Sequence, residues 1–130
     1  MDVVIGPALG GVLVSYEVAR ALKVRSLFAE RVDGALVLRR GFSLKKNEKV
    51  LVVEDVITTG KSTREVMDIV KANGAKLAGI ASLVDRSDGA AVFEENFYSL
   101  LKINIKTYRP EQCPLCKEGK SKAVKPGSRT

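Results

Sequence analysis

Carboxylates and hydroxyls are concentrated in one stretch of the sequence, Glu54-Asp55-Val56-Ile57-Thr58-Thr59-Gly60-Lys61-Ser62. It follows the apolar run Val50–Val53, which is typical of a strand buried on both faces of a parallel sheet. Adjacent strand residues point to opposite faces, so Glu54 and Asp55 at the end of this strand can hold two different groups. Vicinal hydroxyls or a metal-bound ligand would satisfy these two carboxylates.

The second half of the stretch, Thr58 to Ser62, combines hydroxyls with a glycine at the expected start of a helix. Amides at a helix N-terminus, hydroxyl donors and a glycine that permits close approach together form a phosphate cradle. Carboxylates for hydroxyls followed by such a cradle predict a ribose 5-phosphate site. The alternative is that the carboxylates cap a turn and the loop simply begins a helix. A Walker loop is excluded, because no glycine stands four residues before Gly60-Lys61-Ser62.

Another candidate anion site is Gly6-Pro7-Ala8-Leu9-Gly10-Gly11, between an expected strand and an expected helix. Glycines at such a turn allow backbone amides to face an anion. An ordinary tight turn is the alternative.

Elsewhere, apolar patterning predicts strands that alternate with helices. One face of the first helix is expected to hold Val12, Leu13, Tyr16, Ala19 and Leu22. The expected strands are Asp2–Ile5, Val24–Phe28, Ala35–Leu38, Val50–Val53, Leu77–Val84 and Ile103–Lys106, and the further helices are Ser62–Asn73 and Ala91–Leu101. This order predicts an α/β fold with an open, mostly parallel twisted sheet flanked by helices, Rossmann-like, and a ligand at the carboxyl edge of the sheet.

Length and charge limit the remaining choices. The 130 residues allow one domain, expected over residues 1–108, with a basic C-terminal extension over 109–130. Four of the seven net positive charges lie in the last fourteen residues, which speaks against a nucleic-acid-binding face on the folded body. No apolar run is long enough to cross a bilayer, and no signal peptide is recognisable, so we expect a cytoplasmic protein without a membrane partner.

The two cysteines form Cys113-Pro-Leu-Cys116, and the chain has no histidine. This pair is half of a zinc site. A reduced structural turn, a redox pair and a metal shared across a dimer all remain open, with the structural turn favoured.

Residues Glu54–Ser62 resemble the phosphoribosyl-pyrophosphate (PRPP) signature of type I phosphoribosyltransferases. The resemblance implies that Glu54 and Asp55 hold the ribose hydroxyls. It assigns the 5-phosphate to the loop, so that binding involves Val56, Ile57, Thr58, Thr59, Gly60, Lys61 and Ser62. The turn with Leu9, Gly10 and Gly11 is similar to the family's pyrophosphate loop. Arg31 would assist it, and Glu54, Asp55 and Arg31 are the implied catalytic residues.

Within that family the orotate enzymes are the most similar. Phe28-Ala29-Glu30-Arg31, Leu38-Arg39-Arg40-Gly41-Phe42 and Val84-Asp85-Arg86-Ser87 match them in order and spacing. The resemblance implies that Arg86 pairs with the orotate carboxylate and that Thr58 lies on the pyrimidine edge. A salt bridge from Arg86 to Asp85 or Asp88 is the plainer alternative.

The implied reaction transfers ribose 5-phosphate from PRPP to orotate, with Mg²⁺ held mainly through PRPP and not directly by protein ligands. A homodimer with shared active sites is also implied. The N-terminal segment that forms much of the family's hood is expected to be missing, and the region 31–40 lacks the family's loop lysine and histidine. Two alternatives are therefore a phosphoribosyltransferase for a purine base and a non-catalytic PRPP-binding regulatory module.

Overall fold

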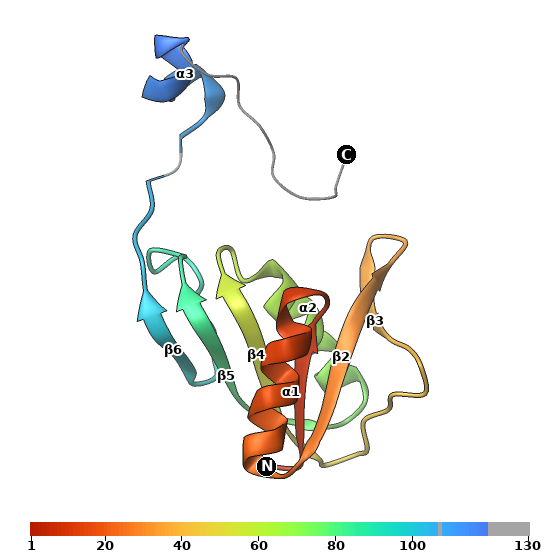
Figure 1. The fold of residues 1–130 in the computed structure, drawn as a ribbon. Helices are drawn as coiled ribbons and strands as arrows, with labels where there is room; N and C mark the ends of the chain where they lie inside the picture. The colour runs from red at the N-terminus through yellow and green to blue at the C-terminus, as the bar shows by residue number, and fades with distance from the viewer. Residues whose placement is uncertain (107, 120–130) are drawn as a thin grey trace.

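The fold is an open sheet with helices on both faces, seen in a computed structural model that describes residues 1–106 and 108–119 (Figure 1). The strands are β1 (Val3–Pro7), β2 (Arg25–Val32), β3 (Ala35–Leu38), β4 (Lys49–Ile57), β5 (Lys76–Asp85) and β6 (Phe97–Lys102). The helices are α1 (Gly10–Leu22), α2 (Lys61–Ala72) and the short α3 (Pro114–Glu118), which follows a 3-10 turn, η1 (Pro110–Gln112).

The six strands follow the order β3-β2-β1-β4-β5-β6. All neighbouring pairs are parallel except β2 and β3, which form an antiparallel hairpin. The predicted open, mostly parallel sheet is therefore confirmed. The chain runs outward in both directions from β1 and β4, so the crevice at their carboxyl ends is where α/β sheets of this kind bind ligands.

The two faces of the sheet are covered unequally. On one face α2 packs over β4, β1, β3 and β5, and its buried residues Val66, Met67 and Val70 join a continuous core that includes Ile5 and Ile80. On the other face α1 covers β1, β2 and β4, with a much smaller buried cluster. Figure 1 shows α1 in front of these strands, while β5 and β6 have no helix before them.

The predicted face of α1 is wrong except at Ala19, which is buried as expected. Leu13 and Tyr16 are 74% and 56% exposed, whereas Gly11, Ser15 and Ala19 form the buried stripe. These small residues recur every four positions and allow the helix to approach the sheet closely. Leu13, Tyr16 and Leu22 are turned outward, while Val14 and Val18 flank the buried stripe.

The expected helix over Ala91–Leu101 and the strand over Ile103–Lys106 are also wrong. Residues 91–96 form neither helix nor strand, and the last strand is Phe97–Lys102, paired in parallel with β5. This run of aromatic and branched side chains meets the exposed edge of β5, where pairing satisfies its backbone groups. Strand β4 also continues through Glu54 and Asp55 to Ile57 instead of ending before them.

Beyond β6 the chain leaves the sheet, and Figure 1 shows α3 away from it. The expected extension from residue 109 begins with η1 and α3, which contact each other. Its basic residues beyond 119 lie outside the described part of the chain. No helix in residues 1–106 and 108–119 is long and apolar enough to span a membrane.

Candidate functional site

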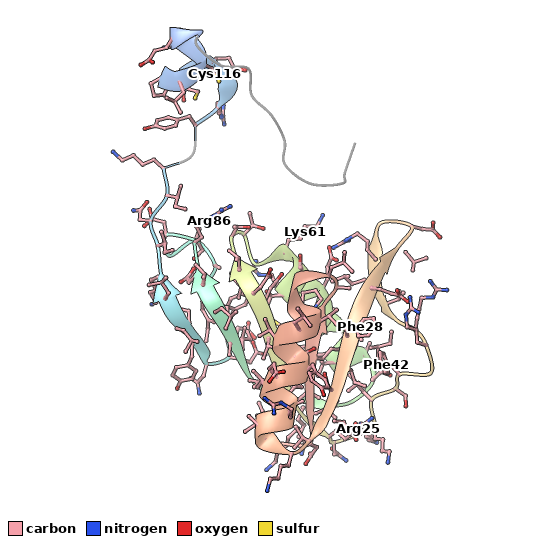
Figure 2. All side chains as sticks on the ribbon, in the orientation of Figure 1. Arg25, Phe28, Phe42, Lys61, Arg86 and Cys116 are labelled. Atoms are coloured by element: carbon pink, nitrogen blue, oxygen red, sulfur yellow. The ribbon has the colours of Figure 1, made fainter. Side chains whose placement is uncertain are left out.

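The predicted site residues meet at the carboxyl edge of the sheet, where β1 leads into α1 and β4 into α2. Figure 2 shows Lys61 and Arg86 at this edge, whereas Arg25 lies at the opposite end of the strands. Three segments that are far apart in the sequence therefore lie together at the carboxyl edge of the sheet: residues 6–11, 54–62 and 85–90. Parallel pairing of β1 with β4 and of β4 with β5 accounts for their meeting.

Glu54 and Asp55 diverge, as their alternation along β4 predicts. Glu54 is directed to the side of α2, where the buried hydroxyl of Thr63 donates a hydrogen bond of 2.6 Å to its Oε2. Burial raises the pKa of Glu54 because the charged form loses hydration, although the Thr63 bond opposes this effect. Its other carboxylate oxygen can accept from a ligand hydroxyl.

Asp55 is directed to the side of α1, against Gly10 at the first position of that helix. A Cβ at Gly10 would collide with the Asp55 carboxyl group in its present position, so glycine here allows the close approach of that carboxylate to the helix. The Asp55 Oδ1 also accepts a 2.8 Å hydrogen bond from the N–H of Val56. The structure thus brings the predicted ribose carboxylate next to the predicted pyrophosphate turn.

The loop Thr58–Ser62 opens α2 as predicted. Gly60 is the N-cap residue in a left-handed conformation, with φ of 72°, and has no side chain to cap the helix. The first amides of a helix have no intrahelical acceptor, so this end of α2 presents N–H donors. Val56 is exposed, whereas Ile57 is occupied within the sheet: its side chain lies in the core, its backbone pairs with Asp85 of β5, and its carbonyl accepts from Arg86 N–H. The predicted contribution of Ile57 to phosphate binding therefore has no free group in this geometry.

A neighbouring cavity of about 810 Å³ is shared by the predicted pyrimidine residues Thr58 and Arg86. Its lining comprises Thr58, Thr59, Arg86, Ser87, Asp88, Ala90, Asn104, Ile105, Lys106 and Tyr108. Within the described ranges Arg86 makes no ion pair, so the alternative of a salt bridge to Asp85 or Asp88 does not describe this geometry. Its guanidinium can therefore meet a ligand carboxylate.

Arg31 is held by other residues of the chain. It donates to the carbonyl of Gly34 within the β2–β3 hairpin and forms a 2.6 Å ion pair with Glu65 on α2. Glu65 is also 3.9 Å from Lys61. The nearby Glu30 carboxylate pairs with Arg39 and Arg40, at 3.7 and 3.1 Å. A ligand contact from Arg31 would therefore compete with Glu65.

Two contributors to the site were missed by sequence reasoning. Thr63 is the buried partner of Glu54; it stands nine positions after Glu54, in the first turn of α2. The Asn104 side chain donates a 2.9 Å hydrogen bond to Asp88 and joins the segment after β6 to the Arg86 loop. Neither residue belongs to a motif, but the hydroxyl three residues after Gly60 was a usable signal for Thr63.

Direct metal ligands are scarce. Among residues 1–106 and 108–119, no three Cys, Asp or Glu side chains lie close enough to hold an ion. Cys113 and Cys116 are free thiols, the first at the N-cap of the five-residue α3 and the second within it, and Figure 2 shows α3 away from the sheet edge. Hydrogen bonds from the backbone N–H and then the thiol of Cys116 lower the pKa of Cys113.

Comparison with known sequences identifies the class of protein to which this fold and site belong. The sequence profile of the phosphoribosyl transferase domain matches residues 1–115. The chain therefore belongs to this family of phosphoribosyltransferases, as its resemblance predicts.

Within the family, the chain is similar to orotate phosphoribosyltransferases. That of Carboxydothermus hydrogenoformans is 59% identical over 98% of this chain and 66% of its own length. That of Thermotoga maritima is 55% identical over 99% of this chain and 68% of its own length. The predicted resemblance to the orotate enzymes is confirmed, and the chain spans about two thirds of the length of these relatives.

Solved structures support the fold. Adenine phosphoribosyltransferase from Thermoanaerobacter pseudethanolicus superposes with a TM-score of 0.70 at 19% identity, covering 78% of this chain and 70% of that one. Orotate phosphoribosyltransferase from Aeropyrum pernix gives 0.65 at 24% identity, covering 78% and 60%. The type I phosphoribosyltransferase fold is therefore confirmed, whereas these distant likenesses leave the base undecided.

Proposed function

We propose that this chain carries the active site of an orotate phosphoribosyltransferase, which makes orotidine 5-monophosphate and pyrophosphate from PRPP and orotate. The observation that carries the proposal is the meeting of the Asp55 carboxylate with Gly10, because it places a hydroxyl-binding group beside an anion-binding turn. The similarity to orotate enzymes over nearly the whole chain supports the choice of base.

The ligand groups have separate places along the edge. Glu54 and Asp55 accept from the ribose hydroxyls, and the amides and hydroxyls of Thr58–Ser62 take the 5-phosphate. Leu9, Gly10 and Gly11 face the pyrophosphate, with Arg31 joining them when it leaves Glu65. Arg86 and Thr58, which share the large cavity, take the carboxylate and edge of orotate.

Catalysis would come from positioning and charge. Pyrophosphate departs from C1 of the ribose while N1 of orotate approaches, and positive charge develops at C1. Holding the ribose by its hydroxyls and 5-phosphate aligns C1 with the base, and the amides at Gly10 and Gly11 stabilise the departing anion. No covalent intermediate with the protein is required.

Mg²⁺ fits this arrangement as a companion of PRPP. It prefers oxygen ligands and commonly uses one or two carboxylates together with substrate phosphates. Glu54 and Asp55 are the carboxylates near the end of β4 that could contact the ion, which would be held mainly by PRPP oxygens. When bound, it supplies positive charge to the leaving pyrophosphate.

Two further attributes follow from the resemblance to the orotate enzymes. We expect a homodimer whose subunits share active sites, and a cytoplasmic location. Sedimentation of the purified protein over a range of concentrations tests the first of these expectations.

The activity is tested by incubating the protein with PRPP, Mg²⁺ and one base at a time, and measuring pyrophosphate release. Orotate should support release, and adenine, guanine and xanthine should not. Release with a purine would instead identify a purine enzyme. PRPP binding without release for any base would identify a binding or regulatory module.

A further inference from the structure

Arg64, on the second turn of α2, contacts two loops at once and belongs to none of the motifs described above. Its Nη1 donates a 2.8 Å hydrogen bond to the carbonyl of Thr59 in the phosphate loop, defined as Thr58–Ser62. Its Nη2 donates a 2.9 Å hydrogen bond to the carbonyl of Val92, 28 residues away. One guanidinium therefore joins the phosphate loop to the segment before β6, residues 91–96.

The face of the same guanidinium lies on an aromatic ring. The Arg64 Cζ is 5.0 Å from the centroid of Phe93, within the range of a cation–π contact. Phe93 in turn packs edge-on against Phe97 at 5.3 Å and against the core on the α2 side. The position of the guanidinium is thus fixed by a ring anchored in the core and by two carbonyl acceptors.

Gly60 lies directly on this assembly. A Cβ at Gly60 would come within 2.9 Å of the Phe93 ring and 3.0 Å of Arg64 Nη1. Gly60 also has a positive φ, so the loop is confined by its own backbone and by what lies beneath it. Arg64 and Phe93 together form the floor of the phosphate loop.

The bond to Thr59 fixes the direction of one peptide unit. The carbonyl of Thr59 and the N–H of Gly60 belong to the same planar group, and in a trans peptide they point in opposite directions. Because Arg64 holds the carbonyl on its own side, the Gly60 N–H points away from Arg64. A reversed peptide would present a carbonyl oxygen to a phosphate instead of a donor.

A second contact keeps the segment before β6 on α2. Lys71, two turns after Arg64, is 3.5 Å from Glu95. The same segment begins next to Ala90, which lines the large cavity, and the N–H of Val92 donates to the carbonyl of Ala90. Arg64 therefore also sets where the phosphate loop lies relative to the wall of the base cavity.

We propose that Arg64 is a positioning residue that orients the phosphate loop for the 5-phosphate and locks it to residues 90–93. The proposal rests on the proposed function only for the identity of the ligand. A lysine could reach one carbonyl but could not donate to both while stacking on Phe93. Replacing Arg64 should therefore weaken 5-phosphate binding without a comparable effect on pyrophosphate, whose turn follows β1.

The test compares Arg64→Gln, Arg64→Lys and, as a matched control, Arg20→Gln, which removes an exposed ion pair with Glu17 on α1. Calorimetric titration with ribose 5-phosphate should show about tenfold weaker binding in Arg64→Gln, as for loss of roughly 1.4 kcal/mol of hydrogen bonding. Arg64→Lys should recover part of that loss. Pyrophosphate affinity should stay within about twofold in all variants. Equal weakening for both ligands, or no change in either, would overturn the proposal.

Hydrogen exchange of the ligand-free proteins separates this proposal from the proposed function. Amides of residues 59–62 should exchange faster in Arg64→Gln than in the wild type and in Arg20→Gln, while β1 and β4 amides stay unchanged. If the wild type binds neither ligand, the proposed function fails, but faster exchange would still support the role of Arg64 in ordering the loop. Unchanged exchange at 59–62 would refute that role.

Discussion

At the scale of single residues, each of the two adjacent carboxylates has its own environment. Glu54 is partly buried against Thr63 on the α2 side, and Asp55 adjoins Gly10 on the α1 side. The pKa of Glu54 is raised by burial. The two adjacent acids meet different surroundings because they project from opposite faces of β4.

Glu54→Gln should stabilise the ligand-free protein near neutral pH. A raised pKa means that the folded state binds the Glu54 proton more tightly than the unfolded chain, whose glutamate titrates near about 4.3. The burial penalty is therefore present above the folded pKa and is relieved as pH falls through it, so the advantage of Gln should disappear in acid. Thermal unfolding of both proteins between pH 4 and 8 measures this difference. A variant less stable than wild type at pH 7 would contradict it.

Gly10→Ala should destabilise the protein by roughly 1–3 kcal/mol, as expected for an overpacked position. The added methyl group would collide with the Asp55 carboxyl group. The double variant Gly10→Ala/Asp55→Ala should recover most of that loss, because the obstructing side chain is gone. Urea unfolding of the two single variants and the double variant gives the coupling free energy. Additive losses would show that the two residues do not meet as described.

At the scale of elements, the sheet is packed heavily on the α2 face and lightly on the α1 face. On the α1 face of β5 and β6, Leu83, Tyr98 and Leu100 are 43%, 70% and 84% exposed. Apolar side chains on one strand can therefore differ greatly in what they contribute to stability.

Ile80→Ala and Leu100→Ala make a matched pair on neighbouring strands. Ile80 is fully buried, so its truncation should lower the free energy of unfolding by about 2–5 kcal/mol. Leu100 is 84% exposed, and its truncation should change that free energy by less than about 0.5 kcal/mol. Chemical denaturation of the wild type and both variants measures these changes in the free energy of unfolding. A loss at Leu100 comparable with that at Ile80 would mean that the outer face of β6 is covered in solution.

The same contrast explains which elements the sequence could predict. The uninterrupted apolar run at Val50–Val53 predicts a strand buried on both faces, and β4 is such a strand. The helical spacing of Val66, Ile69 and Val70 predicts the face that α2 packs against the sheet. The prediction for α1 is right at Ala19 and wrong at Leu13 and Tyr16, because Gly11 and Ser15, which carry little hydrophobic signal, complete the contact with the sheet. The strand β6 was misread because its residues are mostly exposed and depend on pairing with β5.

At the scale of the whole molecule, the strand order brings the segments after β1, β4 and β5 to one edge of the sheet. Residue types and spacing in Glu54–Ser62 predict a ribose 5-phosphate site, which stays a prediction, whereas the role of Arg86 is implied only by the resemblance to the orotate enzymes. Local sequence could not predict the contacts of Arg64, since both acceptors are backbone carbonyls and one of them, that of Val92, is 28 residues away. The engagement of Arg31 by Glu65 likewise follows from the hairpin meeting α2.

The most direct measurement is a calorimetric titration of the folded protein with PRPP in the presence of Mg²⁺, repeated with Asp55→Asn and with the remote control Arg20→Gln. We predict saturable binding of one PRPP per chain, unchanged in Arg20→Gln. In Asp55→Asn we predict binding at least about tenfold weaker, because a hydrogen bond to a charged group contributes roughly 1.5–3 kcal/mol. Absence of saturable binding to the folded wild-type protein, or equal affinity in Asp55→Asn, would contradict a phosphoribosyl-pyrophosphate site at this edge.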